Sequence, residues 1–184
     1  MRIAETYTLL SRIIGYPTEK DVLQAGSEAV SKSLRKRGIP CPLSPFAEFV
    51  ASSTLAALQE DYVATFDFNP AVALYLGHHL YGDNQKKGLY LIGLKQEFRR
   101  SGFTPSGNEL PDHLPLVFQF LAHLAQHEEG EMRQAFISDS VLPGIEGLVA
   151  GFAGRHSSPW KSLVEASRLF CSTDAAAQKE VRPC

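Results

Sequence analysis

Hydrophobic side chains recur at intervals of three and four residues along most of this chain, which is the spacing of amphipathic α-helices. The first segment shows the pattern clearly, at Ile3, Tyr7, Leu10 and Ile14. No segment of useful length alternates apolar and polar residues, and the Asn-Gly and Asp-Gly pairs typical of β-hairpins do not occur. The pattern predicts an all-α protein.

Stretches rich in glycine, proline or asparagine separate the apolar segments and set the expected helix ends. The predicted helices cover residues 3–14, 18–37, 45–66, 71–80, 85–100, 113–127, 132–137, 143–152 and 159–170. We expect a single-domain helical bundle of eight or nine helices over residues 1–171. Residues 172–184, rich in alanine and polar residues, are expected to form a disordered tail.

The helix predicted over 113–127 follows the segment Glu109-Leu110-Pro111-Asp112-His113-Leu114-Pro115. We expect Asp112 to cap this helix by accepting hydrogen bonds from its first backbone N–H groups. Pro115 falls in the first turn, where its missing N–H loses no bond. A simpler interpretation assigns Asp112 and His113 to helix initiation alone.

Two opposite faces of this helix are apolar. One carries a core stripe that includes Leu114, Val117 and Leu121, and the other carries Leu116 and Phe120. Such a helix is either buried on both sides or has one face available for a partner. We predict the second arrangement, a peptide-binding groove formed by Tyr62, Phe66, Tyr81, Glu109, Pro111, Asp112, His113, Leu116 and Phe120. Its carboxylates, together with Glu60 and Asp61, would attract lysine or arginine residues of the bound segment.

Composition and charge narrow the class of protein. Hydrophobic residues make up 44% and charged residues 21% of the 184, with a formal net charge of −2, so a nucleic-acid partner is not indicated. Short basic clusters, such as Arg35-Lys36-Arg37, are expected at helix C-termini, where cations suit the helix dipole. No apolar run is long enough to span a membrane. Three widely spaced cysteines fit a reducing compartment, so we expect a soluble cytoplasmic protein without stable membrane association.

Histidines provide the main alternative to a peptide-binding protein. His123 and His127 lie four residues apart, a helical spacing that can hold one metal ion, and His78, His79 and His113 could supply further ligands. A metal- or cofactor-binding helical protein therefore remains open. No Gly-x-Ser-x-Gly, Gly-x-Gly-x-x-Gly or Cys-x-x-Cys motif is present, which disfavours an enzyme and indicates no particular cofactor.

The segment Glu109 to Pro115, followed by Phe118 and Phe120-Leu121, resembles the signature of the respiratory nitrate reductase delta-subunit family. This family is the NarJ-like branch of the TorD-like molybdoenzyme assembly chaperones. Weaker similarities follow the same order along the chain, from Leu9 to Leu124.

The resemblance implies an all-helical cytoplasmic chaperone that is neither an enzyme nor a subunit of the finished reductase. Its partner would be the N-terminal segment of the catalytic molybdenum subunit of a respiratory reductase. The chaperone would hold that subunit competent for molybdenum cofactor insertion before membrane docking. We expect a monomer or a weak homodimer. A permanent structural subunit is the third possibility, and it would stay with the reductase after maturation.

Overall fold

The structure is a computed structural model that describes residues 1–154 and 158–177. Within these ranges the chain forms ten α-helices, two π-helical segments and one 3-10 segment, and no β-strand. The prediction of an all-α fold is confirmed. The elements are α1 (Ile3–Ile14), α2 (Lys20–Lys36), α3 (Ser44–Ser52), α4 (Leu55–Tyr62), η1 (Val63–Asp67), η2 (Pro70–Val72), α5 (Leu76–Tyr81), α6 (Lys86–Arg100), α7 (Leu114–Gln126), α8 (Gly130–Phe136), η3 (Ile137–Val141), α9 (Leu142–Gly151) and α10 (Pro159–Ala176).

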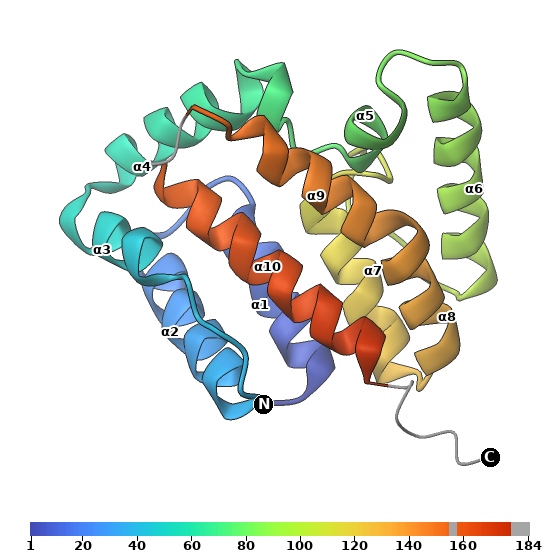
Figure 1. The fold of residues 1–184 in the computed structure, drawn as a ribbon, viewed down its shortest axis with the longest axis horizontal. Helices are drawn as coiled ribbons and strands as arrows, with labels where there is room; N and C mark the ends of the chain where they lie inside the picture. The colour runs from blue at the N-terminus through green and yellow to red at the C-terminus, as the bar shows by residue number, and fades with distance from the viewer. Residues whose placement is uncertain (155–157, 178–184) are drawn as a thin grey trace.

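Helices α1 and α7 pack against each other at the centre, and α9 and α10 lie across them (Figure 1). Helices α2 and α3 flank α1 and α10 on one side. Helix α6 lies at the opposite edge of the bundle, next to α5 (Figure 1). None of the helices in the described part of the chain combines the length and the apolar character needed to cross a membrane.

The segment predicted as one helix over 45–66 is divided in two. The backbone is extended at Ser53, and α4 begins when the Thr54 hydroxyl accepts a hydrogen bond from the N–H of Ala57 at 3.2 Å. Apolar residues keep their helical spacing across this break, which is why the pattern did not show it. Residues 71–80 also differ from the prediction, since they form η2 and the short α5.

Helix α10 extends further than predicted. Asp174, in its last turn, is buried and forms a two-bond ion pair with Arg133 of α8, with N–O distances of 2.9 and 3.1 Å. The prediction that the disordered tail begins at residue 172 is therefore wrong for residues 172–176. Ala177 follows the helix as a turn, and residues 178–184 of that predicted tail lie outside the described residues.

The main core is organised around Trp160 in α10. Its ring lies 5.2 Å from that of Phe46, 5.4 Å from that of Tyr62 and 5.5 Å from that of Phe66, measured between centroids. The indole N–H donates a hydrogen bond to Asp61 at 2.7 Å. Asp61 thus holds α4 against α10. The sequence analysis expected it to be a free carboxylate that attracts the bound segment, and the structure instead gives it this partner.

Candidate functional site

Asp112 lies at the junction of α5 and α7 and is completely buried. Its Oδ2 accepts a hydrogen bond from the N–H of Gly77, the second residue of α5, at 3.0 Å. Its backbone carbonyl accepts a second bond from the N–H of Leu76, also at 3.0 Å. The prediction that Asp112 caps α7 is wrong, because this side chain caps α5 instead. His113 occupies the N-cap position of α7, and Pro115 lies in the first turn as predicted.

Gly77 allows this close approach because it has no Cβ. A Cβ at this position would lie 2.8 Å from Oδ2 of Asp112 and 3.2 Å from a ring carbon of Tyr90. Burial raises the pKa of Asp112, while the hydrogen bond from Gly77 and the nearby charge of Lys87 act in the opposite direction. The segment 109–115 therefore joins α5, α6 and α7 at one point.

Tyr75, Glu109 and His113 form a small polar group at the surface next to this junction. The Tyr75 hydroxyl donates to Oε1 of Glu109 at 3.2 Å, and the rings of Tyr75 and His113 lie 5.1 Å apart. Burial, followed by the charge of Glu109, raises the pKa of Tyr75 to about 12. Burial lowers the pKa of His113, although Glu109, Asp112 and Asp67 oppose this shift. Asp67 thus belongs to the same electrostatic neighbourhood.

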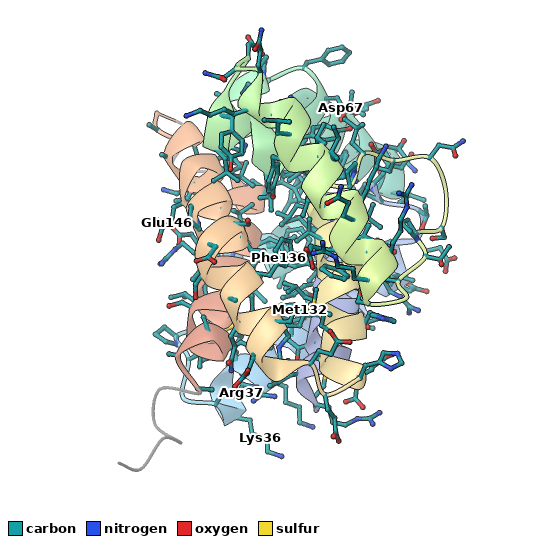
Figure 2. The ribbon with its side chains drawn as sticks, turned by 90° about the vertical axis from the view of Figure 1, so that its right-hand side faces the viewer. Lys36, Arg37, Asp67, Met132, Phe136 and Glu146 are labelled. Carbon is teal, nitrogen blue, oxygen red and sulfur yellow. The ribbon has the colours of Figure 1, made fainter. Side chains whose placement is uncertain are left out.

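Leu116 and Phe120 are buried, with exposed fractions of 4% and 0%. The Phe120 ring packs against Phe98 of α6 at 4.6 Å, and also against Phe103 and Phe136. A second buried cluster, separate from the main core, consists of Phe98, Leu116, Phe120 and Leu124. Phe136 and Met132 of α8 pack against it, and Figure 2 shows α6 running beside them. The prediction that this face of α7 is left exposed is wrong, because α6 and the loop after it cover it.

A small hollow lies beside Leu116. It has a volume of about 290 Å³ and opens between the end of α6 and the loop that leads to α7. Its lining residues are Lys95, Phe98, Pro105, Gly107, Asn108, Glu109, Pro111 and Leu116. Glu109 is exposed here, whereas Pro111 is buried.

The other predicted wall residues lie apart from Phe120. Tyr62 and Phe66 belong to the main core around Trp160 and are buried, whereas Phe120 belongs to the second cluster. Tyr81 is half-buried at the end of α5, where its ring packs 5.4 Å from that of Tyr90. The nine predicted site residues therefore do not line one groove.

An open apolar hollow does exist on the outer side of Tyr62, and the sequence analysis did not identify it. Tyr16 and Phe68 flank it, with exposed fractions of 50% and 81%, and its volume is about 430 Å³. The Phe68 N–H bonds to the carbonyl of Val63 at 3.1 Å, five residues back, which is the π-helical pattern that ends η1. The remaining lining residues are Ala56, Gln59, Glu60, Val63 and Ala64.

A sequence signal for this hollow was available. Phe68 lies in the break Asp67-Phe68-Asn69-Pro70, where a large aromatic residue has no helical face to occupy. Tyr16 likewise lies in the break after α1 and packs its ring 5.5 Å from that of Tyr62. Aromatic residues in polar breaks are candidates for exposed contacts.

Four histidines, His78, His79, His123 and His127, contact the backbone or one another. His79 Nε2 lies 2.7 Å from the carbonyl oxygen of Ala73, and His123 Nε2 lies 2.7 Å from that of Ser101. The rings of His123 and His127 are 4.3 Å apart. Within residues 1–154 and 158–177, no group of three or more histidine, cysteine, aspartate or glutamate side chains could hold a metal ion. The metal-binding alternative gains no support from this part of the chain.

Comparison with known proteins identifies the class. The chain belongs to the nitrate reductase delta subunit family, whose profile it matches over residues 36–164. It is 36% identical to NarJ of Bacillus subtilis (strain 168) over 118 residues, which cover 64% of each protein. It is 30% identical over 129 residues to NarJ of Escherichia coli (strain K12), which is named as a nitrate reductase molybdenum cofactor assembly chaperone.

The chain spans 64% and 53% of the lengths of these two relatives. The fold is also that of a redox enzyme maturation protein from Archaeoglobus fulgidus, with a TM-score of 0.64 at 20% identity, covering 94% of this chain and 95% of the other. The family prediction is confirmed. Both of these NarJ relatives are named as nitrate reductase molybdenum cofactor assembly chaperones, the Bacillus subtilis protein as a probable one.

Proposed function

We propose that this chain is an assembly chaperone for a nitrate reductase-like molybdoenzyme. It binds the N-terminal segment of the catalytic molybdenum subunit and assists insertion of the molybdenum cofactor before the enzyme docks at the membrane. Membership of the family and the likeness to NarJ support this proposal. In the proposal the chain acts in the cytoplasm, without a cofactor of its own, as a monomer or a weak homodimer.

The exposure of Phe68 beside the hollow at Tyr16 is the observation that carries the binding site. Two large aromatic side chains held open to solvent around an apolar floor are typical of a recognition surface. An amphipathic helix can lay its apolar face into such a hollow. Val63 and the two alanines of the lining offer small contacts between the two rings.

Carboxylates lie along one side of this surface. Glu60 lines the hollow, Asp67 precedes Phe68, and Glu109 lies with Tyr75 and His113 in the neighbouring polar group. Lysine or arginine residues of the client segment would be attracted to them. We expect these charges to affect the rate of association more than the final affinity.

The buried residues of the predicted site have a supporting role in this proposal. Tyr62 packs against Tyr16, which lines the hollow, and against Phe66 of η1. Asp112 fixes the start of α7, next to Glu109 and His113. Phe120 holds α6 against the bundle.

Isothermal titration calorimetry of the full chain with a synthetic peptide of the client N-terminus tests the site. We expect Phe68→Ala to weaken binding by about 10-fold or more, since a central aromatic contact contributes about 1.4 kcal/mol or more. Leu89→Ala is the matched control, because Leu89 is also highly exposed but lies on α6. Unchanged affinity in folded Phe68→Ala and Tyr16→Ala variants would reject this surface, and absence of binding to the unaltered chain would reject the peptide-binding function.

A further inference from the structure

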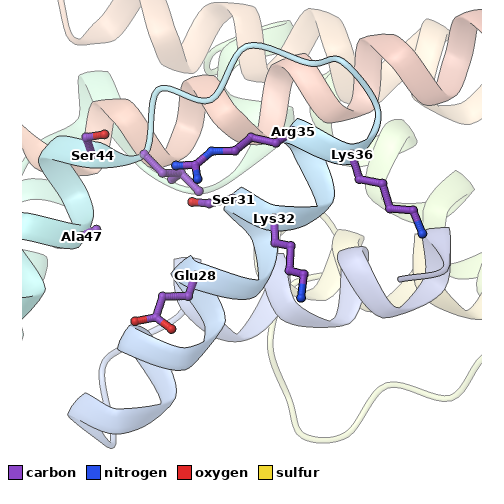
Figure 3. A pocket seen from close by; sticks show the side chains of 8 residues that line it. Glu28, Ser31, Lys32, Arg35, Lys36, Ser44 and Ala47 are labelled. Carbon is purple, nitrogen blue, oxygen red and sulfur yellow. The ribbon is translucent and has the colours of Figure 1, made fainter.

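A third hollow lies between α2 and the start of α3 (Figure 3). Its volume is about 700 Å³, within the range of about 300–1,000 Å³ that is usual for small-molecule sites. Buried Leu43 contributes to its apolar floor. The other lining residues are Glu28, Ser31, Lys32, Arg35, Lys36, Ser44 and Ala47.

Three cations and one carboxylate line this hollow, so its local charge is positive although the whole chain is slightly acidic. Arg35 extends along α2 toward Ser31 and the start of α3, while Lys32 and Lys36 project from the same helix (Figure 3). Within the described part of the chain, these three side chains form no ion pair and no hydrogen bond. An anion entering the hollow would therefore not have to break an existing contact.

The neighbouring Arg37 also lies at the end of α2, but its side chain has partners in the fold. Its guanidinium donates to the carbonyl of Met1 at 3.1 Å and lies 5.7 Å from the centre of the Phe170 ring. Arg37 thus stabilises the fold. Arg35 and Lys36 are exposed and line the hollow, and the fold gives them no comparable role.

The start of α3 adds a backbone donor to these cations. No side chain caps this helix, and Pro45 has no N–H. The N–H of Ser44, which lines the hollow, has no hydrogen-bond partner in the described residues. The positive end of the helix dipole and this free donor favour an anion at the same place as Arg35.

From the hollow and its cations together, we propose that this chain has a binding site for an organic phosphate between α2 and α3. The phosphate group accepts hydrogen bonds from Arg35 and from the start of α3, and an apolar body covers Leu43 and Ala47. The planar guanidinium of an arginine can donate two parallel hydrogen bonds to a phosphate group, and the backbone N–H at the start of α3 can bond another phosphate oxygen. The site is separate from the proposed peptide surface at Tyr16 and Phe68, so it goes beyond the chaperone function.

Nuclear magnetic resonance of the full ¹⁵N-labelled chain at constant ionic strength can test this proposal. Adenosine monophosphate is the probe, and adenosine is the control without a phosphate. We expect saturable shifts of the Ser44 and Ala47 amides, which both line the hollow, with the phosphate and none with adenosine. Arg35→Gln should weaken this binding by about 10-fold, the loss of one charge-assisted contact. Arg99→Gln removes another exposed cation, at the end of α6, and should leave the affinity unchanged.

Three results would overturn the proposal. No shift of either amide with adenosine monophosphate would show that the hollow binds no phosphate. Equal effects of Arg35→Gln and Arg99→Gln would mean that the binding is general charge attraction. Tighter binding of an oligoglutamate peptide at the same amides would assign the hollow to an acidic polypeptide instead. Melting temperatures of both variants should match that of the unaltered chain, since neither arginine side chain has a partner among the described residues.

Discussion

The carboxylate of Asp112 and the backbone N–H of Gly77 are joined by a hydrogen bond of 3.0 Å that connects the start of α7 to the start of α5. The two residues are 35 positions apart in the chain. This bond explains the buried aspartate in the segment that carries the family resemblance. It also makes the junction of α5, α6 and α7 sensitive to single substitutions.

Two substitutions of Asp112 should distinguish the contribution of its hydrogen bond to stability from that of its charge. Asp112→Ala leaves the N–H of Gly77 without a partner and should lower the free energy of unfolding by about 1.5–3 kcal/mol. Asp112→Asn keeps an acceptor and removes a buried charge, so it should be clearly milder. Urea unfolding followed by circular dichroism measures both. Equal stability of the alanine variant and the unaltered chain would contradict the capping role.

Gly77 should not tolerate a methyl group. Gly77→Ala places a Cβ 2.8 Å from the Asp112 carboxylate and should destabilise the fold by about 1–3 kcal/mol. Gly93→Ala is the control, because that helical position in α6 has open space around it and alanine should stabilise it by about 0.5–1 kcal/mol. The two changes should shift the urea midpoint in opposite directions. A shared direction would argue against the steric explanation.

The buried pair of Asp174 and Arg133 should contribute far more to stability than a surface pair. Asp174→Ala leaves Arg133 buried without a counter-charge and should lower the free energy of unfolding by about 3–5 kcal/mol. Tyr7 also loses the acceptor of its hydroxyl, 2.8 Å away. Glu97→Ala breaks the exposed pair with Arg100 and should change stability by less than about 1 kcal/mol. Thermal unfolding of the Asp174→Ala and Glu97→Ala variants measures the two losses of stability.

Stability should fall as the pH drops below about 6.5, the ordinary pKa of histidine. Burial lowers the pKa of His79 and of His113 in the folded chain, so the unfolded chain takes up protons first as the pH falls. The free energy of unfolding should therefore decrease between the ordinary pKa and the lower folded values. Urea titrations at several pH values should show this slope, and a variant with His79→Asn and His113→Asn should have a flatter profile.

Phe120 should act as a core residue. Phe120→Ala removes a completely buried ring and should destabilise the protein by about 3–5 kcal/mol. Phe68→Ala removes an exposed ring and should change stability by less than about 0.5 kcal/mol. Differential scanning calorimetry distinguishes them. A small effect at Phe120 would mean that α6 does not cover this face of α7 in solution.

The sequence could predict features that depend on residues close together in the chain. The three- and four-residue spacing around Tyr7 and Leu10 reports directly on a helix, because helical neighbours are that far apart. Proline ends a helix because it lacks an N–H, and glycine does so because it readily adopts a non-helical backbone conformation. Most helix ends were therefore predicted correctly. The segment 109–115 also indicated the family, which the comparison confirmed.

The tertiary structure alone decided which apolar surface is covered and which polar group has a partner. Phe120 is buried because Phe98 and Phe103 of a different helix and loop pack on it. Phe68 is exposed because no segment among the described residues covers it. Asp112 has the residue type of a cap, but the helix that it caps begins 36 positions earlier, at Leu76. Burial and hydrogen bonding are properties of contacts between distant segments, and local spacing carries no information about which segments will meet.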